Sequence, residues 1–349
     1  MSAGDRRRVT IADIAEEAGV SVPTVSRVLN GRMDVAPETR DRVEELLQRH
    51  EYQRRGTPRG GEASLIDLVF NDLDSPWAVE IIRGVEDVAH DVGVGVVVSA
   101  VHSKATSERR WWQNVQARAS DGVILVTSHL NPRLQAELRR HLPTVVVDPA
   151  GVPSFDLPTI GATNWAGGLS ATEHLAGLGH RRIGVIIGPP RLQCSRARLD
   201  GYRTALDAAG IRTDEGLIYQ GDFYHESGFA GAQKFLALDN PPTAIFASSD
   251  QMAFGVYEAA RQHGMRVPDD LSIVGFDDLP ETRWVSPPLT TVRQPLAEMG
   301  MLAARTVLRL VRGEEIETLR FELATKLVVR ESTAAPRASA HSAAHTKSR

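Results

Sequence analysis

The sequence is poor in cysteine and aromatic residues, and it has no long apolar run. A single cysteine, Cys194, among 349 residues excludes an intramolecular disulfide framework. Three arginines near the N-terminus are followed by no apolar segment, so we expect no signal peptide. No apolar stretch approaches the length of a membrane span. These absences predict a cytoplasmic protein that makes no contact with a membrane.

The sequence also lacks the short motifs of common enzymes. It contains no G-x-S-x-G, no G-x-x-x-x-G-K-[ST], no H-E-x-x-H and no complete G-x-G-x-x-G. Gly93 and Gly95 lack the third glycine of a dinucleotide fingerprint, and the valines around them fit a strand better. We therefore expect a protein that is not an enzyme, with no catalytic residue, no metal and no cofactor.

Length and composition indicate a multidomain globular protein. At 349 residues, with 42% hydrophobic residues and a mean hydropathy of −0.21, the chain is large enough for two or three domains. The net charge of −4 is unevenly distributed, because residues 1–60 hold 11 arginines against 10 acidic residues. A mildly basic head thus precedes an acidic body.

The head carries the pattern of two short helices joined by a glycine turn. Thr10 is a good N-cap and Asp13 follows at capping-box spacing, while Gly19 permits the left-handed turn that ends the first helix. Ser21 caps the second helix, whose inward face is apolar. Its outward residues are Val22, Pro23, Ser26 and Arg27. The pattern alone fits either a plain amphipathic hairpin or a helix-turn-helix that places its second helix in the DNA major groove.

The run from Thr10 to Gly31, continued by Val35, Pro37 to Arg40 and Tyr52, resembles the head of lactose-repressor (LacI/GalR) family transcriptional regulators. The resemblance implies that Arg27 reads bases, with Val22 and Pro23 beside it in the groove. Arginine suits guanine O6 and N7, and valine or proline can contact a thymine methyl. The DNA-binding positions implied in the head are Thr10, Ser21, Val22, Pro23, Thr24, Ser26, Arg27, Asn30 and Thr39.

The body alternates short apolar runs with helical patterns, which predicts βαβ units and parallel sheets. The predicted strands cover 65–70, 92–101, 122–127, 144–148, 182–188, 244–249 and 272–276. The fold class is therefore α/β, with a helix-turn-helix head. Sites in open α/β sheets form beyond the carboxyl ends of the strands.

Signatures in the body extend the family resemblance from Val9 to about Ser332. They are Gly-Ala-Thr-Asn-Trp-Ala-Gly-Gly (161–168), Leu-Gly-His-Arg-Arg-Ile (178–183), Arg-Leu-Asp-Gly-Tyr (198–202), Ser-Asp-Gln-Met-Ala-Phe-Gly (249–255), Val-Gly-Phe-Asp-Asp (274–278) and Pro-Leu-Thr-Thr-Val-Arg-Gln-Pro (288–295). The resemblance implies a periplasmic-binding-protein-like body of two lobes, which the chain crosses between three times, with a ligand between them.

The resemblance implies ligand contacts at Trp77, Arg198, Phe223, Asp250 and Asp277. Asp148, which closes the predicted strand 144–148, is a further candidate. Asp250 has a second interpretation, since an aspartate at a strand end can simply cap the next helix. Trp165 and Trp284 fit a stacking platform, a core position or a dimer interface equally well. Cys194 fits a small buried apolar residue, so we leave it outside the predicted site.

These features predict four segments. They are a helix-turn-helix DNA-binding head at 1–52, a flexible basic linker at 53–63, a two-lobed ligand-binding and dimerisation domain at 64–332, and a disordered tail at 333–349. The expected function is a transcriptional repressor that binds double-stranded operator DNA as a homodimer on the nucleoid and responds to a small effector.

A sugar or short oligosaccharide is the expected effector, because carboxylates and a guanidinium bind hydroxyls while rings cover the apolar face of a sugar. A nucleobase or nucleoside is the alternative, since it would also use an arginine and a stacking phenylalanine. A sugar-binding protein of a transport system would share the body but would have no DNA-binding head. Whether the effector induces or co-represses stays open.

The linker departs from the family pattern. Relatives follow the tyrosine that matches Tyr52 with a short helix carrying a leucine, but residues 53–61 of this chain contain three glycines and a proline that disfavour such a helix. Residues 55–60 differ only at Thr57 from the Arg-Gly-Arg-Pro-Arg-Gly core of AT-hook motifs. Arg55 and Arg59 are therefore predicted to contact DNA, either in a narrow A·T minor groove or as a charged tether that meets phosphates.

Overall fold

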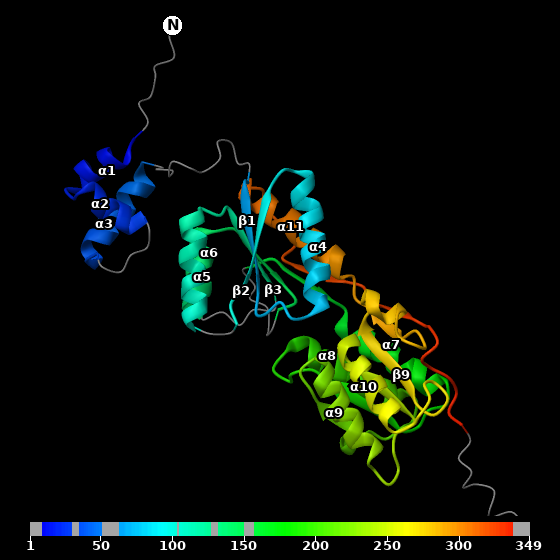
Figure 1. Ribbon diagram of the computed structural model, residues 1–349. Coiled ribbons are helices and arrows are strands. Elements are labelled where there is room, and N and C mark those ends of the chain that lie inside the picture. Colours follow the sequence, from blue (N-terminus) through cyan, green and yellow to red (C-terminus); the bar gives the residue numbers. More distant parts are fainter. Residues whose placement is uncertain are drawn as a thin grey trace, which may run out of the picture.

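The computed structural model describes residues 9–29, 35–50, 63–102, 105–126, 132–149 and 157–337 (Figure 1). A head of three helices is followed by two α/β lobes, each with one six-stranded sheet. No helix in these ranges combines the length and apolarity needed to cross a membrane. The predicted α/β class and helical head are confirmed.

The head consists of α1 (Ile11–Ala18), α2 (Val22–Leu29) and α3 (Pro37–Arg49). Thr10 and Asp13 form the predicted capping box, and Gly19 ends α1 in the left-handed region at φ 64°. The Ser21 hydroxyl accepts a 3.3 Å hydrogen bond from the amide of Thr24. Buried apolar side chains from all three helices make one small core. These local signals explain why the head was predictable.

The N-terminal lobe has a parallel sheet in the order β11-β5-β4-β3-β1-β2. Its strands are β1 (Leu65–Phe70), β2 (Gly95–Ala100), β3 (Gly122–Val126), β4 (Thr144–Val147), β5 (Thr159–Ala162) and β11 (Arg320–Leu323). Its helices are α4 (Pro76–Asp91), α5 (Ala105–Arg118), α6 (Pro132–His141) and α11 (Leu296–Val311). Helices α4 and α11 cover one face of the sheet, and α5 and α6 cover the other (Figure 1).

Helices α4 and α11 pack very closely. A Cβ atom on Gly84 would lie 1.9 Å from the carbonyl oxygen of Ala297, so only glycine fits at this crossing. The close approach explains why α11, which is remote in sequence, belongs to the N-terminal lobe.

The C-terminal lobe has a sheet in the order β12-β10-β9-β8-β6-β7. Its strands are β6 (Ile183–Ile187), β7 (Ile218–Gln220), β8 (Ala244–Ala247), β9 (Ser272–Asp277), β10 (Thr290–Arg293) and β12 (Lys326–Val328). Its helices are α7 (Asn164–Gly177), α8 (Gln193–Ala208), α9 (His225–Leu236) and α10 (Asp250–Gln262), with short 3₁₀ helices η1 (Glu215–Leu217) and η2 (Pro280–Arg283). The pairs α7 with α8 and α9 with α10 cover opposite faces of the sheet.

The chain passes between the lobes three times, as the resemblance implied. It passes from β5 to α7, from β10 to α11, and from β11 to β12. Thr163 and Thr325, on two of these crossings, are hydrogen-bonded side chain to side chain at 3.0 Å. Three adjacent crossings form a hinge that keeps the lobes connected while allowing their angle to change.

Five strands were not predicted, namely β5, β7, β10, β11 and β12. Each has three or four residues and none is a continuous apolar run, unlike the equally short β8, which reads Ala-Ile-Phe-Ala. The predicted parallel sheets are confirmed, with one exception at an edge, where β12 pairs with β10 in the antiparallel sense. The third crossing, from β11 to β12, places β12 at that edge, where it runs in the direction opposite to β10.

The predicted start of a disordered tail at residue 333 is too early. His174 Nε2 and the Thr333 hydroxyl lie 2.9 Å apart, and Ala334 accepts a 3.1 Å hydrogen bond from the Ser272 hydroxyl. Arg337 forms ion pairs with Asp269 and Asp270. Residues 333–337 therefore belong to the C-terminal lobe, and residues 338–349 lie outside the described ranges.

Candidate functional site

Helix α2 presents an exposed polar face opposite its buried one. Val25 and Val28 are buried in the head core, whereas Val22 is 41% exposed and Pro23 and Arg27 are also exposed. Thr24 and Ser26 are half-buried at the edge of this surface. The first turns of α2 and the Arg27 side chain thus lie where a recognition helix meets base edges.

Residues predicted to contact phosphate lie at the starts of helices. Thr10 caps α1 and Ser21 directly precedes α2, and both are exposed, while Thr39 is half-buried in the first turn of α3. Free amide groups at a helix N-terminus favour an anion, which suits a DNA phosphate. Three other predicted DNA contacts, Asn30, Arg55 and Arg59, lie outside the described residues.

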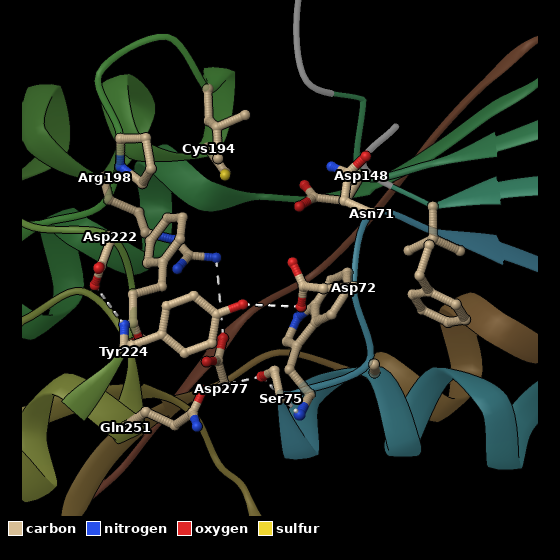
Figure 2. Close-up of a pocket in the computed structure, with 18 of the residues that line it drawn as sticks. Asn71, Asp72, Ser75, Asp148, Cys194, Arg198, Asp222, Tyr224, Gln251 and Asp277 are labelled. Atoms are coloured by element: carbon tan, nitrogen blue, oxygen red, sulfur yellow. Dashed lines mark hydrogen bonds and ion pairs between the residues drawn. The ribbon is translucent and has the colours of Figure 1, made fainter. Parts of the chain in front are cut away.

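A second candidate site is a cavity of about 310 Å³ between the two lobes, within the size range of small-molecule sites (Figure 2). Its walls come mainly from residues that follow strands at their carboxyl ends, as expected for α/β sheets. Five of the six predicted ligand residues line it, namely Trp77, Asp148, Arg198, Phe223 and Asp277.

Asp277 ends β9 and directs its carboxylate into the cavity (Figure 2). The side chain is buried, and its nearest cation is Arg198, whose Nη2 lies 4.0 Å from Oδ1 of Asp277. Oδ1 has no hydrogen-bond partner among the described residues. A buried carboxylate oxygen without a partner is costly, so this atom is suited to accept a hydrogen bond from a bound molecule.

Arg198 is fixed by a set of hydrogen bonds. Its Nε donates to Asn164 Oδ1 at 2.8 Å, Nη1 donates to the carbonyl of Ser248 at 2.6 Å, and Nη2 donates to Gln294 Oε1 at 2.9 Å. The guanidinium also stacks 3.7 Å from the ring centroid of Phe276. Since a guanidinium has five N–H donors, two remain for the cavity.

The other three predicted ligand residues are placed by local backbone features. Asp148 follows β4 and Phe223 follows β7, both with positive φ (47° and 79°), which is unusual for residues other than glycine. Trp77 lies in the first turn of α4, where its amide donates to the N-cap Ser75 at 3.3 Å. The cavity therefore combines carboxylates, one fixed guanidinium and aromatic rings, among them those of Trp77 and Phe223.

Asp250 is the one predicted ligand residue that the structure places away from the cavity. Asp250 is fully buried at the start of α10 and does not line the cavity. Its carboxylate accepts hydrogen bonds from the amide of Leu279, at 2.8 Å, and from the hydroxyl of Thr291. The capping interpretation also fails, because Ser249 is the N-cap. Asp250 instead supports the turn that follows Asp277.

Sequence reasoning missed several residues that line the cavity. Tyr224 Oη donates to Asp72 Oδ1 at 2.8 Å and Ser75 Oγ donates to Gln251 Oε1 at 2.9 Å, and both bonds join the N-terminal lobe to the C-terminal lobe (Figure 2). Asp72 follows β1, so the position after a strand, which indicated Asp148, also pointed to it. No local sequence pattern indicated which residues of one lobe form hydrogen bonds with residues of the other lobe.

Cys194 is buried, as predicted, but it also lines the cavity from which we excluded it. Burial raises the pKa of its thiol to about 12, so the group stays a neutral thiol. It therefore contributes a small, weakly polar wall.

A second hollow of about 410 Å³ shares Asp148 and Cys194 with the first cavity. Trp165 lines it and is 45% exposed, while Trp284 is 74% exposed, so a core position is wrong for both tryptophans. Trp165 lies in the wall of this hollow, where its ring can serve as a stacking platform.

Burial is the main reason that the pKa of Asp277 is raised to about 7, since Arg198 lowers this pKa and the nearby Asp148 raises it to a smaller extent. The folded protein therefore holds a proton on Asp277 at pH values where the unfolded chain, with a pKa of 3.8, has lost it. It follows that Asp277 lowers the free energy of unfolding as the pH rises from about 4 to about 7.

We predict that Asp277→Asn raises the stability of the ligand-free protein more at pH 8 than at pH 5. The difference between the two gains is expected to be on the order of 1–3 kcal/mol, because the wild type loses the rest of its pH-dependent stability between these pH values and the variant does not. Thermal unfolding of both proteins at the two pH values measures it. Equal differences at pH 5 and pH 8 would contradict the assignment of this titration to Asp277.

Two family models match the chain. Residues 10–55 match the model for bacterial regulatory proteins of the lacI family, and residues 172–333 match a periplasmic binding protein-like domain. The first covers α1 to α3, and the second covers most of the C-terminal lobe and α11.

Whole-chain comparisons agree. The transcriptional repressor CytR of Escherichia coli is 35% identical over 329 residues, which cover 93% of this chain and 96% of CytR. Among solved structures, the regulator CelR in complex with cellobiose is 34% identical with a TM-score of 0.72, covering 93% of this chain and 100% of CelR. The lac repressor dimer bound to operator and an anti-inducer is 29% identical with a TM-score of 0.69, covering 94% of this chain and 100% of the repressor chain.

The exposed face of α2, the cavity between two hinged lobes and these full-length relatives lead to one conclusion. The chain belongs to the LacI family of ligand-responsive, DNA-binding transcriptional regulators.

Proposed function

We propose that this regulator is a homodimeric repressor whose operator affinity is set by a neutral, polyhydroxylated effector, a sugar or short oligosaccharide, bound in the cavity between the lobes. The observation that carries the proposal is the buried Oδ1 of Asp277, which lacks a hydrogen-bond partner among the described residues beside the fixed Arg198. A sugar hydroxyl can donate to Asp277 and accept from Arg198 at once.

The charge of the cavity supports a neutral effector. Its walls carry four carboxylates, Asp72, Asp148, Asp222 and Asp277, against two arginines, Arg191 and Arg198. An anionic effector such as a phosphorylated sugar would meet an excess of like charge, which disfavours it. Phe223 and Trp77 provide the apolar surface that the C–H face of a sugar ring needs.

A nucleoside is the second candidate. The repressor CytR is 35% identical over 93% of this chain, and the relatives also include a ribose operon repressor of Halalkalibacterium halodurans at 34% identity. A nucleoside has a ribose for Asp277 and a base that can stack on Phe223. A nucleoside is also neutral, so the charge of the cavity does not distinguish a nucleoside from a sugar.

A thermal-shift panel with the full-length protein tests the effector class. We expect a neutral mono- or disaccharide, at a concentration about 100 times its dissociation constant, to raise the apparent stability by about 2.7 kcal/mol. D-Ribose, cellobiose and glucose represent sugars, cytidine and adenosine represent nucleosides, and glucose 6-phosphate is the anionic control. A shift with nucleosides alone would replace the sugar by the second candidate, and a shift with glucose 6-phosphate alone would contradict a neutral effector.

We further propose how the effector changes operator binding and where in the cell the repressor acts. An effector can change operator binding only if it binds the open and closed lobe arrangements with different affinity. Two heads are then held at half-site spacing in one arrangement and lose that register in the other. Because the operator is chromosomal DNA, we place the repressor in the cytoplasm on the nucleoid.

For the linker, we predict that replacing both Arg55 and Arg59 by alanine weakens operators with A·T-rich centres more than operators with G·C centres. The reason is that a narrow A·T minor groove has an enhanced negative potential that attracts arginine. Competition binding with matched operator pairs measures the difference. An equal loss on both operators would leave the linker as a charged tether that contacts phosphates.

A further inference from the structure

The turn formed by Asp277, Asp278 and Leu279 joins the cavity to the core of the other lobe. Asp277 lines the cavity, and two residues later Leu279 is only 1% exposed. Leu279 belongs to the hydrophobic cluster of the N-terminal lobe, whose other buried members come from β1, α4, β3, β4, β5 and α11. One side chain that follows a C-terminal-lobe strand is therefore packed into the N-terminal lobe.

The backbone of this turn is strained. Asp277 has φ 120° and Asp278 has φ 60°, a region that residues with a Cβ atom rarely adopt. Two consecutive residues of this kind persist only where the surroundings hold them in place. The strain lies between the carboxylate that faces the cavity and the leucine in the other lobe.

Two side chains hold the turn, the buried Asp250 and the half-buried Arg330. Asp250 accepts the amide hydrogen of Leu279 at 2.8 Å, and its other oxygen accepts the hydroxyl hydrogen of Thr291. Arg330 forms an ion pair with Asp278 and donates to the carbonyl of Leu289 at 2.7 Å. Neither Asp250 nor Arg330 lines the cavity. Both anchor the turn to the C-terminal lobe, so a movement of that lobe is passed to Leu279.

We propose that Asp250 and Arg330 are positioning residues that hold the turn 277–279, and that Leu279 transmits the state of the cavity to the N-terminal lobe. The second half of the proposal rests on the proposed function, because it assumes that an effector binds at Asp277. The first half concerns the ligand-free protein and is tested without an effector.

Hydrogen exchange in the ligand-free, full-length protein tests the first half. In Arg330→Ala and in Asp278→Ala we expect at least a tenfold faster exchange in residues 276–284 and also in α4, which packs in the cluster of Leu279. Helix α5 packs in a different cluster of the same lobe and should exchange as in the wild type. Asp278→Asn keeps an acceptor oxygen and tolerates positive φ, so it should restore slow exchange.

Arg309→Ala is the matched control, since it removes an exposed ion pair with Glu314 and should leave all three regions unchanged. Faster exchange in residues 276–284 with an unchanged α4 would overturn the link through Leu279. An equal increase in α5 would also overturn it, because that pattern indicates general destabilisation.

The second half is tested with Leu279→Ala and the more conservative Leu279→Met, using cellobiose, D-ribose and cytidine as probes. A probe that binds the wild type should bind Leu279→Ala within about threefold by calorimetry, because Asp277 is intact. The protection that the probe gives α4 in hydrogen exchange should be lost in Leu279→Ala and kept in Leu279→Met. Undiminished protection of α4 in Leu279→Ala would overturn the transmission role.

Absence of binding by every probe to the wild type would count against the proposed function. In that case the ligand-free exchange experiment still decides whether Asp250 and Arg330 hold the turn and whether Leu279 couples it to α4. The ligand-free exchange experiment therefore also includes Asp250→Asn. We expect this variant to accelerate exchange in residues 276–284 at least threefold. Unchanged exchange there would remove Asp250 from the positioning role.

Discussion

Replacing Arg27 by alanine is expected to abolish the discrimination between operator and random DNA while leaving the cavity between the lobes intact. Arg27 is exposed on α2, next to the exposed Val22 and Pro23, and it lies in the head rather than in either lobe. A lost bidentate contact to guanine costs about 1–3 kcal/mol per half-site. Two half-sites double the cost, so the ratio of affinities should fall by at least about 30-fold.

Quantitative footprinting on an operator selected by the wild type, against random DNA of the same length, measures this ratio. Arg42→Ala is the control, because Arg42 is an exposed arginine of α3 in the same head. A phosphate contact at Arg42 would weaken both DNAs alike and leave the ratio unchanged. An unchanged ratio in Arg27→Ala would remove Arg27 from base readout.

The second large effect is expected in the cavity. Asp277→Asn and Arg198→Ala should give repressors that bind operator as the wild type does but no longer respond to the effector. Each variant leaves a group on the bound effector without its charged partner, which costs about 1.5–3 kcal/mol, or roughly 10- to 150-fold in affinity. The head is unaffected, because neither residue contributes to its core.

Calorimetry with the effector found in the thermal-shift panel measures the loss. Arg198 also binds Asn164, Gln294 and the Ser248 carbonyl, so Arg198→Lys is included as a variant that keeps a charge in this buried network. Arg203→Ala, which removes an exposed ion pair on the same helix α8, is the control. Wild-type affinity in both Asp277→Asn and Arg198→Ala would mean that other residues bind the effector.

Much of the fold and five of the 19 residues that line the cavity could be predicted, and most of the signals for the fold are local. The cap at Thr10, the turn at Gly19 and the apolar face that includes Val25 are each encoded within a few residues. Asp148 was found because it follows a β-branched strand at its carboxyl end, where α/β sheets bind ligands, whereas Asp277 was found through the family resemblance of residues 274–278.

The misses have a common physical cause, which is long-range packing. Asp250 has the same local context as Asp277, but Leu279 and Thr291 occupy its oxygens, and only the folded chain brings those residues to it. The contact between Tyr224 and Asp72 joins residues 152 positions apart. The short edge strands depend on pairing with neighbours rather than on their own pattern.

The central claim is that occupation of the cavity between the lobes changes the affinity of the head for DNA. Its most direct test is fluorescence anisotropy of a labelled operator fragment titrated with the full-length repressor, with and without a saturating concentration of the sugar or nucleoside that binds. The account predicts at least a fivefold change in operator affinity, the lower end of typical allosteric coupling, and no change in Asp277→Asn. The same operator affinity with and without the bound effector would contradict it.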